Sequence, residues 1–415
     1  MSTLRGRLAA SLPALVVVFV LVHVWLGLIN LYWAPDGFND VRGVYLRWMQ
    51  HAFDTGSWVG IELPWVYPIV ALVPVALAYL PGPDLYPVSW LWLVTIVDLV
   101  ALAVLIGWRS PRRLAAGWWW AGFLFLLGPV AVGRIDTVSV AVAVCAIALL
   151  ARRPAVAVAL LTVATWIKVW PIAVLGAVLI AVPRRVRTVL LALATSAVIV
   201  GVALALGSGI RIASFISAQT TRGLQIEAPI STAWLWAAAT GAPGTRVYFD
   251  TKIITYQVVG SGTDVASAVM TPLLVAAVVL VALLGIRAVR RGAEAARLLP
   301  ALVTALVSCL IVFNKVGSPQ YIAWLAVPLL LIVLHGGARP RLPIVLILAM
   351  ATMTQFIYPY LYFGVLDLNP GMLALLTVRN LLLVALFAWS VIALARSAHG
   401  VPRVPDGGVA HPRYA

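Results

Sequence analysis

Long apolar runs separated by short arginine clusters most limit what this chain of 415 residues can fold into. Hydrophobic residues make up 63% of it and charged residues only 10%, against roughly 25% in soluble globular proteins. A soluble core cannot hold that much apolar surface, so a bilayer must act as the solvent. The runs are continuous rather than alternating, which favours helices over a barrel. The sequence therefore predicts an all-α polytopic membrane protein.

The net charge of +16 would point to nucleic acid in a soluble protein. Here the positive charge lies mostly in clusters between apolar runs, which is the orientation signal of a membrane protein. We therefore expect the bilayer as a partner and no nucleic acid. The two cysteines, Cys145 and Cys309, lie inside apolar runs and are interpreted as packing residues. The histidines are scattered and no metal-binding or nucleotide-binding motif occurs, so no metal and no cofactor are expected.

Placing every arginine cluster on the cytoplasmic side gives the cheapest orientation, with both termini cytoplasmic. The first apolar segment is too long for a signal peptide and is interpreted as a retained helix. The excess of arginine over lysine, with abundant Ala and Val, indicates a GC-rich bacterial genome, so the expected location is the bacterial cell (inner) membrane. About twelve crossings are predicted, against about 20 residues for a typical one. The predicted helices are 9–31, 85–107, 114–132, 137–151, 154–167, 170–183, 188–207, 268–288, 298–313, 321–335, 342–358 and 372–395.

The positions of the clusters constrain what lies between them. The run Val66–Leu80 is short and holds two prolines; a crossing there would invert the charge pattern, so we expect an interfacial or re-entrant helix. Pro154–Val182 must contain an even number of crossings, so it is predicted to be two short helices joined at residues 167–171. Residues 1–415 then form one membrane domain with two large extracytoplasmic loops, 32–84 and 208–267.

Nearly all the carboxylates fall on the predicted outer side, so chemistry is expected there. Asp40 precedes an amphipathic segment and has two interpretations, as a helix N-cap or as a catalytic base. Asp136, in the turn Gly133–Thr137, is either a helix cap or one half of a polar pair with Arg134 that lines a cavity. The long loop 208–267 carries Glu227 and is too polar to lie in lipid.

Three cations on the same side could bind a phosphate. Lys168 lies between two tryptophans at the turn of the broken helix pair; it either snorkels to the interface or anchors a lipid phosphate. Lys315 has the same two interpretations. Arg379 lies inside the last predicted helix, where pairing with a buried acid is the alternative. Tryptophan and tyrosine residues nearby either form an interfacial belt or pack on sugar faces.

Several of these residues resemble motifs of glycosyltransferase family 87, polyprenyl-phosphate-mannose-dependent α-mannosyltransferases with the GT-C fold. Asp40, Tyr45, Gly56 and Tyr67-Pro68 are similar to the family's "D…Y…G…YPP" loop. Gly133-Arg134-Ile135-Asp136 resembles its "GQ(I/V)(N/D)" turn, with arginine in place of glutamine, and Ile167–Pro171 resembles its "(V/L)K(L/V)xP" turn. A weaker echo follows at Ser318-Pro319-Gln320. The second proline of the first motif is Ile69 here, and Gln320 and Tyr321 stand where some members carry histidines.

The resemblance implies an inverting transfer of a sugar, mannose in the family, from a polyprenyl phosphate to a glycolipid or glycan acceptor on the extracytoplasmic face. It makes Asp40 the catalytic base. Lys168, with Arg134, Lys315 or Arg379, would hold the donor phosphate. Alternatives are arabinofuranosyl transfer, a lipid-linked sugar transporter or flippase, and a structural subunit without activity. The residues expected at the substrates are Tyr45, Tyr67, Asp136, Gln320 and Glu227.

Overall fold

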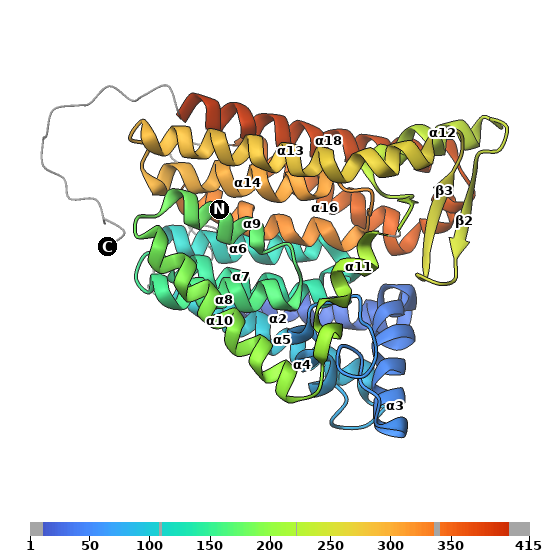
Figure 1. The fold of residues 1–415 in the computed structure, drawn as a ribbon, viewed down its shortest axis with the longest axis horizontal. Helices are drawn as coiled ribbons and strands as arrows, with labels where there is room; N and C mark the ends of the chain where they lie inside the picture. The colour runs from blue at the N-terminus through green and yellow to red at the C-terminus, as the bar shows by residue number, and fades with distance from the viewer. Residues whose placement is uncertain (1–10, 108–109, 221, 336–340, 398–415) are drawn as a thin grey trace, which may run out of the picture.

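The computed structural model describes residues 11–107, 110–220, 222–335 and 341–397. Long helices run roughly parallel and form a bundle (Figure 1). Each predicted apolar segment is a helix in the structure, with its ends shifted by a few residues. The helices are α2 Leu12–Leu28, α5 Tyr86–Ile106, α6 Pro111–Leu127, α7 Ile135–Leu149, α8 Pro154–Ile167, α9 Ile172–Ala181, α10 Arg185–Ala205, α13 Thr263–Arg290, α14 Ala295–Val312, α15 Ala326–His335, α16 Arg341–Gln355 and α18 Pro370–Ser397.

Eight helical segments of the described residues are long and apolar enough to cross a membrane. They include short π-helical or 3₁₀ turns that extend α2 to Trp33, α6 to Ala131 and α16 to Tyr360. The remaining apolar helices, among them α7, α8 and α9, have 10–17 residues. The protein is thus a multi-pass membrane protein. Six arginines of the predicted cytoplasmic side lie outside the described residues: Arg5, Arg7, Arg109, Arg339, Arg403 and Arg413.

Local sequence signals explain where several helices begin. Ser11 accepts a hydrogen bond from the backbone of Ala14 and caps α2, and Ser110 caps α6 in the same way, each followed by proline in the first turn. Proline is suited to that turn because it lacks the N–H that would go unpaired there. The oxygen of Asn369 accepts from the backbone of Gly371 at the start of α18.

Burial divides the bundle into inner and outer helices. Most residues of α14 are buried, and α14 packs against α9, α13, α15 and α18. Most of α10, by contrast, is exposed and apolar, with Leu190, Leu193 and Val198 on its surface. Exposed apolar side chains on a long helix are expected where the helix faces lipid rather than water.

The two large loops gather at one end of the bundle (Figure 1). The first loop holds a π-helical turn Val41–Tyr45, α3 Leu46–Thr55 and the six-residue α4 Leu72–Leu77. Helix α4 is far too short to cross, in agreement with the interfacial or re-entrant helix predicted there. The pair α8 and α9 is joined by a turn at Lys168–Pro171, as the charge pattern predicts.

The second loop contains a small sheet that the sequence did not predict. Strands β1 Leu224–Gln225, β3 Thr255–Val259 and β2 Arg246–Asp250 pair antiparallel in that order. Helix α11 Ser214–Thr220 precedes β1, and helix α12 Thr232–Ala239 lies between β1 and β2 in sequence. Helix α13 follows β3 and runs along the bundle (Figure 1), so the arginines at its far end lie away from the sheet. The sheet thus belongs to the end that carries the candidate site.

Candidate active site

Asp40 lies at the start of the π-helical turn Val41–Tyr45, but its side chain makes no capping hydrogen bond. Asp40 thus occupies the N-cap position of this turn, but it does not cap through its side chain. Its Oδ2 atom lies 3.3 Å from Nε of Arg134, and 27% of the side chain is exposed. The carboxylate is thus paired with a cation on one side and reachable on the other.

Arg134 is buried and fixed by the protein's own groups. Its Nη1 donates to the carbonyl oxygens of Gly37 at 2.6 Å and of Gly133 at 2.9 Å, and its Nη2 donates to the hydroxyl of Tyr358 at 2.7 Å. Burial alone would lower the pKa of Arg134, but Asp40 and Tyr358 outweigh it and the pKa is raised. Arg134 therefore stays charged and holds the Asp40 carboxylate in place.

The turn that carries Arg134 requires glycine just before it. A Cβ atom on Gly133 would overlap with the carbonyl oxygen of Gly37, so any other residue would push the two loops apart. Since Gly37 also accepts from Arg134, this close approach brings the Asp40 loop onto the start of α7. A glycine at 133 thus serves a packing role that the motif alone did not reveal.

A second ion pair joins Asp136 and Lys168. Nζ of Lys168 lies 3.1 Å from Oδ2 of Asp136, while Oδ1 of Asp136 accepts from Nε1 of Trp324 at 2.7 Å. Asp136 lies in the first turn of α7 but caps no helix, so its interpretation as a helix cap is wrong. Lys168 ends α8 and is 14% exposed, which leaves its ammonium accessible but not free in solvent. The expected pairing of Asp136 with Arg134 is thus replaced by pairing with Lys168.

Burial alone would lower the pKa of Lys168, but the carboxylate of Asp136, with Tyr67 and Tyr321, outweighs it. The pKa is raised as a result, so Lys168 carries its charge throughout the neutral range. An ammonium that is permanently charged and has donors to spare is suited to hold a phosphate.

Tyrosine rings connect the two ion pairs. Nζ of Lys168 lies 4.4 Å from the ring centroid of Tyr67, within the range of a cation–π contact. Tyr67 packs edge-on against Tyr45 at 6.3 Å, and the hydroxyl of Tyr45 accepts from the backbone of Ile135 at 3.1 Å. Tyr45 is therefore buried between the first loop and α7. The rings of Tyr45 and Tyr67 thus lie between the two ion pairs, Asp40–Arg134 and Asp136–Lys168.

A third pair is formed by Glu227 and Arg379, both buried. Nη1 of Arg379 lies 2.6 Å from Oε2 of Glu227, and Nη2 donates to the carbonyl oxygen of the same residue at 3.0 Å. Arg379 is thus paired with a buried acid, the alternative that its position in a helix indicated. Burial raises the pKa of Glu227 more than Arg379, and Arg134 at longer range, lower it. Oε1 of Glu227 is buried without a hydrogen-bond partner among the described residues.

The remaining expected residues lie on the loop before α15. The carbonyl oxygen of Lys315 accepts from the backbone of Gln225, which ties this loop to the small sheet. Oε1 of Gln320 accepts from the hydroxyl of Ser318 at 2.5 Å. Gln320 is thus held within its own turn, and no hydrogen bond joins it to either ion pair among the described residues. Two site residues were not expected from the sequence. Tyr358 accepts from Arg134 and Trp324 donates to Asp136, and each lies more than 180 residues along the chain from its partner.

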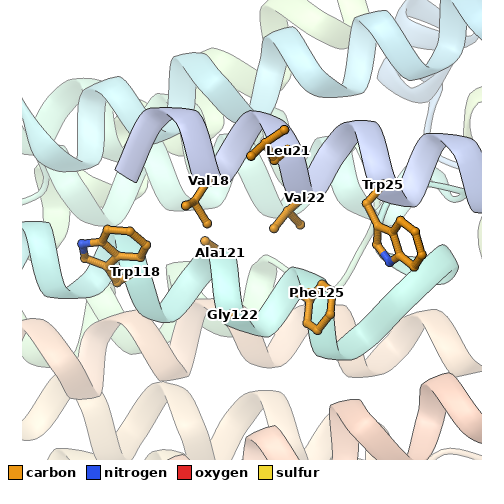
Figure 2. A pocket seen from close by; sticks show the side chains of 8 residues that line it. All are labelled: Val18, Leu21, Val22, Trp25, Trp118, Ala121, Gly122 and Phe125. Atoms are coloured by element: carbon orange, nitrogen blue, oxygen red, sulfur yellow. The ribbon is translucent and has the colours of Figure 1, made fainter. Parts of the chain in front are cut away.

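No group of three or more potential metal ligands occurs in the part of the chain that the structure describes. An apolar groove of about 400 Å³ runs between α2 and α6. Figure 2 shows Trp25 and Phe125 at one end of it and Val18 and Trp118 at the other. Helix α2 leads toward the loop of Asp40 and α6 toward Arg134, so the end at Trp25 lies nearer the ion pair.

Comparison with known protein families matched residues 65–312 to glycosyltransferase family 87. The matched region covers more than half of the chain. It includes Arg134, Asp136, Lys168 and Glu227 and begins after Asp40. A search of curated proteins gave no match.

Proposed function

Since the chain belongs to glycosyltransferase family 87, a GT-C membrane family, we propose that it transfers mannose from a polyprenyl phosphate to a glycolipid or glycan acceptor. The observation that carries this proposal is the reachable carboxylate of Asp40, paired with the buried Arg134 and separated by the Tyr67 ring from the partly exposed Lys168. One carboxylate and one phosphate-binding cation are the minimum for direct displacement at a sugar carbon.

In the proposed reaction, the acceptor hydroxyl attacks C1 of the donor sugar and gives its proton to Asp40. The bond between C1 and the phosphate oxygen breaks, and the electron pair leaves with the polyprenyl phosphate. The salt bridge to Arg134 uses Oδ2 of Asp40, so Oδ1 is the oxygen available for the acceptor. Direct displacement inverts the configuration at C1.

Lys168 is proposed to hold the donor phosphate and to stabilise the charge that grows on it. Its raised pKa and its remaining donors support this role. Arg379 is not assigned to the phosphate, because its side chain is only 5% exposed and its nitrogens already donate to Glu227 and Asn380, whereas 14% of the Lys168 side chain is exposed. Arg134 acts from behind Asp40, since Gly37, Gly133 and Tyr358 occupy most of its N–H groups. Its role is to position the base.

The polyprenyl chain is proposed to lie in the groove between α2 and α6. The groove is lined by apolar and aromatic side chains, and both helices are long enough to cross the bilayer (Figure 2). A lipid tail that enters laterally would thus be buried while its phosphate approaches the loops at the groove's end.

We also propose about twelve crossings, with the sheet and the first loop on the extracytoplasmic face. This orientation puts the arginine-bearing turns inside. Single cysteines at Asp54 and at Arg152, in a background without Cys145 and Cys309, test it. A membrane-impermeant maleimide applied to intact cells should label residue 54 and not residue 152. The reverse pattern would refute the orientation.

The test of the function is Asp40→Asn in a transfer assay with polyprenyl phosphate carrying radiolabelled mannose. Loss of a general base is expected to slow transfer by roughly 10²- to 10⁴-fold. Asp54→Asn removes an exposed carboxylate from the same loop and should leave transfer unchanged. Equal activity of Asp40→Asn and wild-type protein would eliminate Asp40 as the base.

A further inference from the structure

The charges around the candidate site cancel in pairs. Asp40 faces Arg134, Asp136 faces Lys168, and Glu227 faces Arg379, each at 3.3 Å or less. A phosphate diester that enters adds a negative charge which none of these pairs offsets in full. Because an uncompensated buried charge is costly, a further cation is required beside the phosphate.

Arg222 is a cation of this region that has no carboxylate partner among the described residues. It lies half-buried just before β1, in the loop that follows α11. Its Nε donates to the carbonyl oxygen of Ala218 at a long 3.4 Å. Its own carbonyl oxygen accepts from the hydroxyl of Ser267, at the start of α13. The backbone of Arg222 is thus hydrogen-bonded to α13, while the charge of its guanidinium has no carboxylate partner among the described residues.

Gln225 positions the guanidinium from the other side. In the amide orientation that satisfies both neighbours, its oxygen accepts from Nη1 of Arg222 at 3.2 Å and its nitrogen donates to the carbonyl oxygen of Gly317 at 3.0 Å. Nη2 of Arg222 has no hydrogen-bond partner in the described part of the chain. A guanidinium that is held at Nε and Nη1 and open at Nη2 can bind an anion without first breaking a salt bridge.

Tyr321 connects Arg222 with the Lys168 pair. Arg222, Lys168 and Asp136 all lie close enough to interact electrostatically with the Tyr321 hydroxyl. The Tyr321 ring stacks on Trp324 at 4.2 Å, and Trp324 donates to Asp136. The charges of the two cations therefore act on the same tyrosine hydroxyl from different segments of the chain.

We propose that Arg222 binds the phosphate of the lipid-linked donor together with Lys168, and supplies the positive charge that the three ion pairs do not. This inference rests on the proposed function for the identity of the donor. It makes Arg222 a substrate-binding residue, while Arg134 and Arg379 serve as partners of carboxylates.

Arg222→Gln tests the proposal, with Arg211→Gln as the matched control. Arg211 is exposed and precedes α11 in the same loop. Purified protein is titrated with farnesyl phosphate and with uncharged farnesol, and the donor KM and kcat are measured separately. A charge-assisted contact is worth enough to raise the donor KM about ten- to hundredfold in Arg222→Gln, with a similar loss of farnesyl phosphate affinity. Farnesol binding and the Arg211→Gln protein should be unchanged.

The conservative variant Arg222→Lys keeps the charge and should recover part of the affinity. The proposal is overturned if farnesyl phosphate binds Arg222→Gln as tightly as wild type, or if farnesol affinity falls to the same extent. If wild-type protein transfers no sugar from any polyprenyl phosphate donor, the proposed function fails. The farnesyl phosphate titrations still decide the role of Arg222 in that case.

Discussion

Replacing Asp136 by asparagine should make the use of donor depend on pH where the wild-type protein does not. The introduced side chain keeps an oxygen that can accept from Nε1 of Trp324, so the packing around the residue is preserved. What disappears is the negative charge 3.1 Å from the ammonium of Lys168. The substitution therefore isolates the electrostatic part of the pair.

The sign follows from the two opposing effects on Lys168. Burial lowers the pKa of its ammonium, and in wild-type protein Asp136 outweighs burial and raises it. Without the carboxylate, burial dominates and the pKa falls. Leaving one member of a buried pair uncompensated costs about 3–5 kcal/mol, and partial exposure of Lys168 puts the cost at the lower end. A neutral Lys168 loses a charge-assisted contact with the phosphate, which raises the donor KM roughly ten- to hundredfold.

The donor KM is measured between about pH 6.5 and 9.5, a range that stays below the ordinary lysine pKa. Asp54→Asn serves as the control. Wild-type and control proteins should show no rise that is attributable to Lys168, because a raised pKa keeps the residue protonated across this range. The KM of Asp136→Asn should climb as pH rises. The stability of Asp136→Asn should rise with pH over this range, because a lowered pKa means that the unfolded chain holds the Lys168 proton more tightly than the folded protein does. The wild-type pair, by contrast, stabilises the fold until pH passes the raised pKa. Superimposable pH profiles of Asp136→Asn and wild type would refute the electrostatic account of this pair.

Two further substitutions test the packing around the site. Gly317→Ala should lower the apparent melting temperature in detergent by several degrees, because its Cβ would overlap with backbone atoms of Glu227; Gly43→Ala, which meets nothing within 4 Å, should not. An equal effect of both would mean that the tight approach is unimportant. Gly122→Leu places a side chain where nothing lies within 4 Å and should partly fill the groove between α2 and α6. The kcat/KM should then fall severalfold for long polyprenyl donors and stay constant for a short-chain donor; an equal loss for both would argue against the lipid-tail groove.

The bundle is predictable because the bilayer leaves little choice for an apolar run. The helix predicted at residues 154–167 is α8, and the neighbouring segment 170–183 differs from α9 by two residues at each end. The small sheet escapes prediction because its strands have at most five residues and lack a buried face of alternating apolar side chains. No periodic signal distinguishes such strands from an irregular loop.

Site residues are predictable by type but not by partner. The cost of a buried charge requires Lys168 and Arg379 to be compensated, yet nothing in the spacing of 152 residues links Arg379 to Glu227. Neither aspartate makes a capping hydrogen bond, and the reason is the same for both. A cap contributes about 1 kcal/mol, whereas leaving Arg134 or Lys168 unpaired in a buried position costs more. The carboxylates of Asp40 and Asp136 therefore pair with cations, and the helices begin without them.

The pairing of a proposed base with Arg134, taken alone, works against catalysis, since a cation makes a carboxylate a weaker proton acceptor. The overall charge of the site resolves this. When Asp40 takes the acceptor proton, its negative charge disappears and Arg134 is left uncompensated. At the same moment the departing phosphate gains a second negative charge. Proton transfer thus moves one negative charge from the carboxylate to the phosphate, and the total charge among the cations stays constant. Because Arg134 is fixed by two carbonyl oxygens and a tyrosine, it need not move as the charge shifts, and so it stabilises the change without reorganisation.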